Sequence, residues 1–257
     1  MNLFDLTGKV AIITGSTKGI GKAIAMRMAE HGARVVISSR KGPACEETAS
    51  EINALHGHGR EIAAAIPCNV SHREELQRLV AGTNAKWGKI DILVCNAAVN
   101  PYFGPGKDIP DDAFDRVLET NVKCNFWLCN MVIPQMIERK DGVIIIISSI
   151  AGIRGSELLG AYGISKAADL QLARNLAVEY GPYNIRANCI APGLIKTYFA
   201  RALWENETIL ENRNSTTPLR RIGEPDEIAG AAVFLASKAG AFMTGQSIVI
   251  DGGVTIA

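Results

Sequence analysis

A tyrosine and a lysine stand four residues apart in the segment AYGISKAAD, at Tyr162 and Lys166. On a helix this spacing places both side chains on one face, so the ammonium of Lys166 can lie close to the phenol. A nearby positive charge favours the phenolate form, which would allow Tyr162 to act as a general acid and base. Such a pair is common in helices, so its meaning depends on the rest of the chain.

A glycine-rich segment, TGSTKGIG at 14–21, follows an apolar run and leads directly into a helical pattern. In such a strand-to-helix turn, backbone N–H groups and the positive end of the helix can bind a pyrophosphate. The spacing is G-x-x-x-G-x-G and differs from the standard G-x-G-x-x-G fingerprint. The turn therefore indicates a dinucleotide site of a variant type.

The residues that follow the second apolar run indicate which dinucleotide is bound. An acidic residue about 20 positions beyond the glycines usually binds the ribose hydroxyls, whereas an arginine suits a 2′-phosphate. Here the run ends in ISSRK, with Ser39 in place of the acid and Arg40 next to it, and Lys18 lies in the glycine turn. Two cations without a carboxylate favour NADP(H), because a phosphate needs charge-assisted donors. Use of NAD(H) stays open.

Seven short apolar runs must position these residues, and helical patterns separate them. The runs are KVAIIT, ARVVIS, EIAAAIP, IDILVCN, GVIIIIS, IRANCIA and SIVIDGG. Runs that are apolar on both faces and alternate with helices predict a parallel sheet covered on both sides. We therefore expect one α/β domain over 1–257, with a doubly wound, Rossmann-type, seven-stranded parallel sheet flanked by helices.

Three local signals refine this expectation. Ser71 with Glu74 predicts a capping box that opens a helix toward Trp87, and Gly32 predicts the end of the helix that begins near Gly21. The irregular segment at 194–221 predicts an element that covers the substrate rather than a linker.

The fifth run ends on two serines, Ser148 and Ser149. Ligands of open α/β sheets bind outside the carboxyl ends of the strands, so the change from isoleucine to serine predicts the point where core gives way to a binding site.

Composition excludes several other classes of function. The 257 residues carry a net charge of only +1, which gives no electrostatic support for binding nucleic acid or an anionic membrane. The apolar runs are too short to span a bilayer and the N-terminus has no signal-like core, so we expect a cytoplasmic protein. The six cysteines form no CxxC pair and predict buried, reduced thiols. No ligand spacing surrounds the four histidines, so we expect no metal site.

Several motifs occur together in one order along the chain: TGSTKGIG, CNAA at 95–98, Asn121 in ETNVKCNF, Ser149, Tyr162 with Lys166, and APGLIKT at 191–197. In this combination the sequence resembles the short-chain dehydrogenase/reductase family across essentially its full length. The thirteen residues from Ser149 to Tyr162 match the family's spacing, which selects Ser149 over Ser148.

The resemblance implies a role for each of four residues. Ser149 would hydrogen-bond the substrate oxygen, and Tyr162 would donate a proton to it during reduction. Lys166 would hold the nicotinamide ribose and tune the tyrosine, while Asn121 would position a water in the proton relay. Hydride would arrive from the nicotinamide, and no metal is needed.

The resemblance also implies the cofactor-binding residues. They are Gly15, Thr17, Lys18, Gly19, Ile20 and Gly21 at the pyrophosphate, Ser39 and Arg40 at the adenosine phosphate, Asn69 and Val70 at the adenine, Asn96 and Ala97 near the ribose, Tyr162 and Lys166 at the nicotinamide ribose, and Pro192, Gly193, Ile195 and Thr197 at the nicotinamide. The family's usual N-N-A-G reads C-N-A-A here, and its usual Asp-Val reads Asn69-Val70. We expect activity to survive these changes, with somewhat weaker adenine binding.

For the substrate, NAAVNPYFG and APGLIKTYFARALWEN look similar to NADP-dependent carbonyl reductases that act on aromatic ketones, diketones and retinal-like compounds. The residues expected to contact the substrate are mostly apolar or aromatic and favour a lipophilic ketone. They are Asn100, Tyr102, Phe103, Leu158, Leu159, Tyr198, Leu203 and Trp204.

Two alternatives remain open. A 3-oxoacyl-thioester reductase would want a basic surface for an acidic carrier protein, and Arg174, Arg201 and Arg213 form no evident cluster. A catalytically silent dinucleotide-binding regulator would be the natural interpretation only if one of the four catalytic residues were missing.

By analogy with the family, the helices at 112–140 and 162–180 would form a dimer face, so a homodimer or homotetramer is expected.

Overall fold

The computed structural model describes residues 2–257, and its centre is one sheet of seven parallel strands in the order β3-β2-β1-β4-β5-β6-β7. The strands are β1 (Val10–Thr14), β2 (Arg34–Ser38), β3 (Ala63–Ala65), β4 (Ile92–Cys95), β5 (Gly142–Ile147), β6 (Ile185–Pro192) and β7 (Ser247–Ile250). Each predicted apolar run corresponds to one of these strands, and only β6 extends beyond its run, by one residue. The expected Rossmann-type sheet is therefore confirmed.

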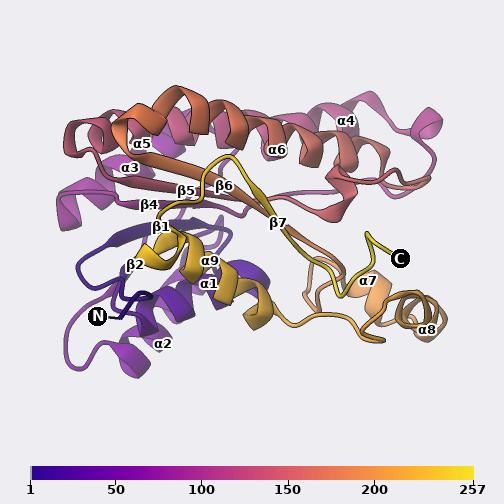
Figure 1. Cartoon of the computed structure of the whole chain (residues 1–257), viewed down its shortest axis with the longest axis horizontal. Coiled ribbons are helices and arrows are strands. Elements are labelled where there is room, and N and C mark those ends of the chain that lie inside the picture. The colour runs from indigo at the N-terminus through magenta and orange to yellow at the C-terminus, as the bar shows by residue number, and fades with distance from the viewer. Residues whose placement is uncertain (1) are drawn as a thin grey trace.

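Helices cover both faces of the sheet (Figure 1). One face carries α1 (Gly19–Glu30), α2 (Gly42–His56) and α9 (Pro225–Ala236), and the other carries α3 (Arg73–Trp87), α4 (Asp111–Leu118), α5 (Cys124–Arg139) and α6 (Gly160–Tyr180). Neighbouring strand residues point to opposite faces, so Ile13 and Ile145 join one apolar cluster while Ile12 and Ile144 join the other. Both faces are buried, which is why the strands read as continuous apolar runs.

The order of the strands reverses direction at β1. The chain builds outward from β1 to β2 and β3, then returns to place β4 on the other side of β1 and continues to β7. The loops after β1 and β4 therefore diverge and leave a crevice at the carboxyl ends of these strands. The glycine turn follows β1 and Asn96 follows β4, so both lie at this edge.

The helical structure expected over 112–140 is present over 111–139, but it consists of α4 and α5 joined by a π-helical turn at Glu119–Lys123. One predicted helix start is wrong. The capping box expected from Ser71 and Glu74 does not form, because the Ser71 hydroxyl lies 3.1 Å from the hydroxyl of Thr120 and α3 begins only at Arg73. Gly32 does follow the end of α1, with a φ of 95° that favours glycine.

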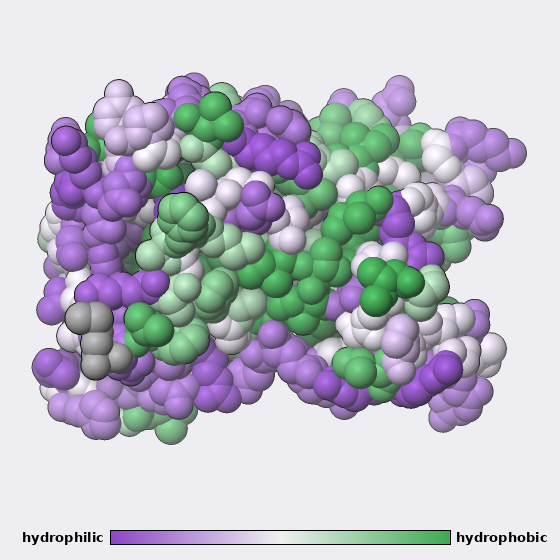
Figure 2. All heavy atoms as spheres, in the orientation of Figure 1, coloured by the Kyte–Doolittle hydropathy of each residue, from purple (hydrophilic) through white to green (hydrophobic). Residues whose placement is uncertain are grey.

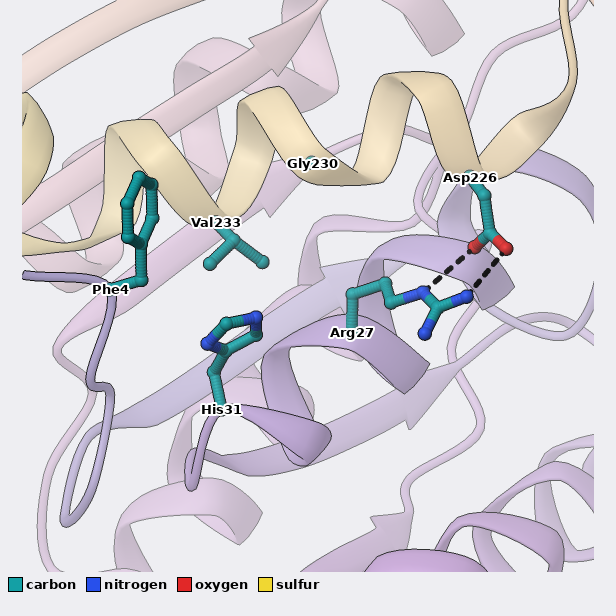
Figure 3. Close-up of a pocket in the computed structure, with 6 residues that line it drawn as sticks. All are labelled: Phe4, Arg27, His31, Asp226, Gly230 and Val233. Carbon is teal, nitrogen blue, oxygen red and sulfur yellow. Dashed lines mark hydrogen bonds and ion pairs between the residues drawn. The ribbon is translucent and has the colours of Figure 1, made fainter. Parts of the chain in front are cut away.

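Helices α1 and α9 pack side by side, and Arg27 joins them with two hydrogen bonds to Asp226 (Figure 3). Beside this pair, Phe4, His31 and Val233 line a surface hollow of about 250 Å³. None of the predicted site residues lines it. Within residues 2–257, no helix is long and apolar enough to cross a membrane.

The segment at 194–221 departs from the regular alternation of strands and helices. It contains two helices, α7 (Arg201–Trp204) and α8 (Glu207–Thr216), which lie beyond the ends of the strands near the C-terminus (Figure 1). Its two ends are held together, because the N–H of Lys196 donates to Gly223 at 2.9 Å and that of Gly223 donates to Leu194 at 3.0 Å. We call residues 194–221 the covering segment.

Four short 3-10 turns complete the structure: η1 (Gly106–Asp108), η3 (Ile150–Gly152), η4 (Gly181–Tyr183) and η5 (Lys238–Gly240).

Candidate active site

The glycine turn between β1 and α1 needs its glycines for two different reasons. Gly15 and Gly19 have φ values of 65° and 56°, which side-chain-bearing residues rarely adopt. At Gly21 the limit is space, because a Cβ would lie 2.5 Å from the Gly15 carbonyl oxygen. Thr17 and Lys18 complete the turn, and Ile20 lies in the first turn of α1. The free N–H groups at this helix end form a cradle that fits a pyrophosphate.

Residues that follow β4 hold this turn in place. The backbone N–H groups of Asn96 and Ala97 each donate to the Thr14 hydroxyl at 3.0 Å. The Asn96 amide donates to the carbonyl of Thr14 at 2.8 Å and to that of Gly15 at 3.1 Å. Asn96 therefore fixes the glycine turn from the neighbouring strand.

The corner expected to hold the adenosine phosphate carries positive charge. Ser39 and the exposed Arg40 follow β2. The chain after β3 lies against them, since the N–H of Cys68 donates to the Ser39 carbonyl at 2.9 Å, and Asn69 and Val70 come next. No acidic residue follows β2 before α2. This arrangement suits a phosphate better than free ribose hydroxyls.

Lys18, the second cation predicted to bind the phosphate, contacts the covering segment. Its ammonium lies 3.8 Å from the ring centroid of Tyr198. A cation over an aromatic face is attracted by the ring. The glycine turn touches the same segment at Thr197, whose methyl group would lie 3.1 Å from a Cβ at Gly19. Residues predicted for the pyrophosphate and for the nicotinamide are therefore in contact.

The two serines after β5 have different surroundings. The Ser148 hydroxyl is buried and donates to the Lys166 carbonyl at 2.8 Å. Ser149 is only partly buried, and its hydroxyl accepts the N–H of Ala151 at 3.1 Å, which leaves its own proton free to be donated. Ser148 thus ties strand to helix, while the Ser149 hydroxyl keeps a proton that it can donate.

Glycines let the turn that bears Ser149 dock on α6. A Cβ at Gly152 would lie 2.5 Å from the backbone carbon of Lys166, and one at Gly163 would lie 2.8 Å from the Ala151 carbonyl oxygen. Only glycine permits such an approach. The turn η3 therefore sits directly against the part of α6 that carries Tyr162 and Lys166.

Lys166 is almost fully buried beside Tyr162. Its ammonium lies 5.8 Å from the Tyr162 ring centroid and donates to the Ile147 carbonyl at 2.9 Å. It also pairs with Asp169 at 2.9 Å, a partner that the sequence prediction missed. The available signal was the spacing, because residues three apart on a helix share a face. An acid three residues after a buried lysine is an obvious candidate partner.

Asn121 lies in the π-helical turn and is fully buried. Its side chain accepts the N–H of Val99 at 2.8 Å and donates to the Val99 carbonyl at 3.0 Å and to the Ser165 hydroxyl at 3.0 Å. Asn121 thus joins the loop after β4 to α6. Its backbone carbonyl accepts the Asn125 amide at 2.7 Å.

The residues predicted for the nicotinamide lie at the end of β6. Pro192 is the last residue of that strand, and the N–H of Gly193 donates to Ile250 of β7 at 2.9 Å. Ile195 is buried, and the Thr197 hydroxyl lies 3.3 Å from its carbonyl. These residues lead from the sheet into the covering segment.

Two loops expected to contact the substrate lie side by side. Gly104, which follows Tyr102 and Phe103, donates its N–H to Leu158 at 3.0 Å. Leu159 forms an isolated bridge with Gly104, and Asn100 precedes this loop after β4. The two loops that carry the predicted apolar residues are therefore adjacent in the structure.

In the covering segment one aromatic residue that was not predicted lies beside the catalytic tyrosine. Phe199, which was not predicted, approaches the Tyr162 ring at 6.1 Å between centroids. Its neighbour Tyr198 contacts Lys18. Trp204 donates its indole N–H to the Thr197 carbonyl at 2.8 Å, and Leu203 lies beside it in α7. Phe199 could have been found from the sequence, since it stands in the same aromatic YF pair as Tyr198.

The thiols and histidines take no visible part in this site. All six cysteines are free and buried, as expected, and burial raises the pKa of the Cys68 thiol to about 12. Among the residues that the structure describes, no group of three or more histidine, cysteine or acidic side chains could hold a metal ion.

Comparison with known proteins relates the whole chain to enzymes. Residues 15–255 match a family model described as "Enoyl-(Acyl carrier protein) reductase". "Dehydrogenase/reductase SDR family member 4" from Bos taurus is 43% identical over 248 residues, which cover 96% of this chain and 88% of the relative. "Dehydrogenase/reductase SDR family member 2, mitochondrial" from Homo sapiens is 40% identical over 247 residues, which cover 96% of this chain and 86% of the relative.

Solved structures share the fold closely. A 7 alpha-hydroxysteroid dehydrogenase complexed with NADH and 7-oxo glycochenodeoxycholic acid superposes with a TM-score of 0.93 at 39% identity, covering 98% of this chain and 97% of that one. A gluconate 5-dehydrogenase from Burkholderia cenocepacia in complex with NADP and tartrate gives 0.93 at 32% identity, covering 99% and 98%.

Proposed function

The chain belongs to the short-chain dehydrogenase/reductase family of oxidoreductases, and we propose that it uses NADP(H) to interconvert a ketone or aldehyde and an alcohol. One observation carries the proposal. The Lys166 ammonium lies 5.8 Å from the Tyr162 ring on the part of α6 against which the turn bearing Ser149 is docked. This brings a proton donor, a cation and a hydroxyl together at the carboxyl edge of the sheet.

Each of the four residues has a separate task in this proposal. Ser149 donates a hydrogen bond to the substrate oxygen, and Tyr162 gives that oxygen a proton during reduction or removes one during oxidation. Lys166 places its positive charge beside the phenol and holds the nicotinamide ribose. Asn121 positions a water that resupplies the proton. When bound, the cofactor supplies or accepts the hydride.

The preference for NADP(H) rests on charge. Lys18 and Arg40 carry the cations, and Ser39 stands where a ribose-binding acid would repel a phosphate. The related structures contain both kinds of cofactor, NADP in one and NADH in the other, so the family alone does not decide the preference. We propose that the cofactor also contacts the other predicted residues. Among these, Asn69 and Val70 lie at the adenine, Gly15 lies at the pyrophosphate and Thr197 lies at the nicotinamide.

A lipophilic carbonyl compound is the substrate class that we propose. The exposed aromatic side chains Phe103, Tyr198 and Phe199 lie on the loops and the covering segment at the edge where the cofactor would bind. Apolar walls with few polar groups bind apolar molecules best. We propose that the covering segment closes over the substrate and that Phe199, beside Tyr162, packs against it. The neighbour that holds a 7-oxo steroid conjugate supports this class.

One observation favours the second candidate, a 3-oxoacyl-thioester reductase: the description of the family model names an acyl carrier protein, although it refers to an enoyl group rather than a 3-oxo group. The charges on the surface favour it less. Arg201 is paired with Glu205 at 2.6 Å, and Arg174 donates to Gln171. A basic surface for an acidic carrier would need such arginines free. A catalytically silent regulator is disfavoured because all four catalytic residues are present.

The direct test is a panel of aromatic ketones, diketones and acetoacetyl thioesters, with the corresponding alcohols, each assayed with NADPH or NADP⁺ and with NADH or NAD⁺. We expect turnover of lipophilic ketones, with a higher kcat/KM for NADPH than for NADH. Preferential turnover of the thioesters would favour the second candidate. A clear preference for NADH would contradict the role assigned to Lys18 and Arg40.

We also propose a homo-oligomer. Phe126 of α5 and Ile164 and Val178 of α6 are exposed, although they are large and apolar. Figure 2 shows a second apolar area across the middle of the face that contains the edge strand β7, where Val249 is exposed. An unpaired apolar edge and an apolar helix face are both surfaces that association would cover. The cytoplasmic location expected from the sequence stays a prediction, and one relative is named as mitochondrial.

A further inference from the structure

A second buried charge, the carboxylate of Asp169, lies next to Lys166 on α6. One Asp169 oxygen accepts the Lys166 ammonium at 2.9 Å, and the two side chains are only 0% and 3% exposed. The other oxygen accepts the Asn125 amide at 3.0 Å. Both oxygens of Asp169 therefore have partners, and this pair lies well inside the protein.

We propose that Asp169 is a positioning residue that holds Lys166 as a charged ammonium beside Tyr162, through an ion pair that the interior of α6 encloses. The inference rests on the proposed function, because it assigns Asp169 to the proton-transfer machinery of Tyr162 and Lys166. Asp169 touches neither substrate nor cofactor, and it acts through Lys166.

The geometry leaves Lys166 one free direction. An ammonium has three N–H donors. One points to the Ile147 carbonyl and one to Asp169, so the third is left for Tyr162 or for a ribose hydroxyl. Two fixed contacts from strand and helix thus determine where the third donor points. A lysine without Asp169 would have a single anchor and a long flexible chain.

The pair is also connected to the π-helical turn. The Asn125 amide donates both to Asp169 at 3.0 Å and to the Asn121 carbonyl at 2.7 Å. The π-helical turn at Glu119–Lys123 widens the helix at this point. Such turns occur frequently at functional sites. Asn121 and Lys166 are therefore linked through Asn125 and Asp169 without any water.

Charge is the reason to expect a functional rather than a structural role. Burial acts to lower the pKa of Lys166, but Asp169 and the Tyr162 phenol raise it, and the net direction is upward. The titratable groups that face Lys166 are otherwise buried thiols: Cys189 of β6, Cys95 of β4 and Cys124 of α5. None of these neutral thiols replaces the carboxylate.

Stability alone gives little reason for such a pair. Burying two charges costs desolvation energy, and replacing a buried ion pair by apolar side chains is often neutral or stabilising. Removing only one partner leaves an uncompensated charge and is strongly unfavourable. The pair is therefore better explained by what the ammonium does for Tyr162.

The test is the pH profile of alcohol oxidation in the Asp169→Asn variant. The amide keeps the shape and removes the charge, so Lys166 loses its proton at lower pH. We expect the ratio of kcat at about pH 10 to kcat at about pH 7 to fall roughly tenfold or more relative to the wild type. Glu179→Gln, which removes an exposed acid from the same helix, should leave the ratio unchanged. An equal loss of kcat at every pH in Asp169→Asn would overturn the proposal.

A second readout does not depend on turnover. Lysines labelled with ¹³C at Cε report the protonation of Lys166 by NMR, and the signal is assigned by its loss in Lys166→Met. We expect the Lys166 signal to titrate at lower pH in Asp169→Asn than in the wild type. An unchanged titration would refute the role of Asp169, whereas a wild-type enzyme without any turnover would refute only the proposed function.

If Asp169→Asn does not fold, the double variant Lys166→Met/Asp169→Leu decides the question. It removes both charges and keeps the volume apolar, so we expect it to fold and to be inactive. A double variant as unstable as Asp169→Asn would show that the site needs Asp169 for packing rather than for charge.

Discussion

Cofactor choice depends on single side chains at the adenosine corner of the site. Arg40 follows β2 and is exposed, and no acid stands near it in the loop before α2. A charge-assisted hydrogen bond to a phosphate contributes about 1.5–3 kcal/mol. We expect Arg40→Ala to raise the KM for NADPH roughly tenfold or more and to leave the KM for NADH almost unchanged, as measured by steady-state kinetics with one ketone.

Arg34 provides the matched control for this prediction. It is an exposed arginine at the opposite end of the same strand, β2, away from the carboxyl edge. Arg34→Ala should therefore leave both KM values unchanged. Equal effects of Arg40→Ala on the two cofactors would show that Arg40 does not bind the 2′-phosphate.

Some residues of the candidate site could be predicted from the sequence and others could not. Ser149, Tyr162 and Lys166 were predictable because their spacing along the chain reflects one strand end and one helix face. Asp169 was missed although its spacing places it on the same face as Lys166, because burial of an acid there becomes evident only once β6 and α5 pack against the helix. Phe199 was missed because the path of the covering segment decides which ring of the YF pair reaches Tyr162.

At the scale of elements, the docking of η3 on α6 sets the distance between the serine and the tyrosine. A side chain at Gly152 would meet backbone atoms of Lys166 and Ala167 at 2.5 and 2.7 Å, and backbone cannot move aside as a flexible side chain can. We expect Gly152→Ala to lower the melting temperature by several degrees, since overpacking costs about 1–3 kcal/mol. It should also reduce kcat strongly by displacing Ser149.

The neighbouring glycine, Gly155, serves as the control. A Cβ there would meet nothing within 4 Å, and its φ is not in the left-handed region. Gly155→Ala should keep both the melting temperature and kcat close to the wild-type values. A Gly152→Ala variant with normal kcat would contradict the proposed contact between this turn and the catalytic helix.

The start of α9 predicts a dependence of stability on pH. Glu227 accepts two hydrogen bonds from Arg221 and one from the backbone of Glu224, where it completes a capping box. Mainly through its hydrogen bond with Arg221, the pKa of Glu227 is lowered from 4.5 to about 2. Because the folded pKa is depressed, this stabilisation is present above pH 4.5 and is lost as the pH falls toward 2.

We therefore expect Glu227→Gln to lower the melting temperature by about 2–4 °C at neutral pH and by less near pH 3, as measured by calorimetry. Glu205→Gln breaks an exposed pair with Arg201 in which the carboxylate accepts no backbone N–H, and it should have a smaller effect. If the melting-temperature difference between the wild type and Glu227→Gln is as large near pH 3 as at neutral pH, the ion pair is not its cause.

The elements themselves were largely predictable, and the exceptions have a physical reason. All seven strands could be found because a sheet that is covered on both faces needs continuous apolar runs. The π-helical turn between α4 and α5 could not, since the residues at Glu119–Lys123 are compatible with an ordinary helix. The π-helical turn depends on tertiary contacts such as those of Asn121 with Val99. The capping box at Ser71 failed for a similar reason, because the Ser71 hydroxyl lies next to Thr120 instead.

At the scale of the whole molecule, association depends on the exposed apolar faces. Val178 of α6 is 82% exposed, and Phe126 and Ile164 are about half exposed. We expect light scattering after size-exclusion chromatography to show a dimer or tetramer. Ile164→Glu combined with Val178→Glu should weaken it, because charges buried in an interface are costly. A wild-type chain that is monomeric at micromolar concentration would contradict this prediction.

The central claim is that this chain transfers hydride with Tyr162 as its acid and base. The most direct measurement compares the wild type with Tyr162→Phe in the reduction of a lipophilic ketone by NADPH, together with NADPH binding followed by fluorescence. We predict that the variant binds NADPH normally and that its kcat falls at least about a hundredfold, because a positioned general acid contributes that much. A Tyr162→Phe variant that reduces the ketone at close to the wild-type rate would contradict the claim.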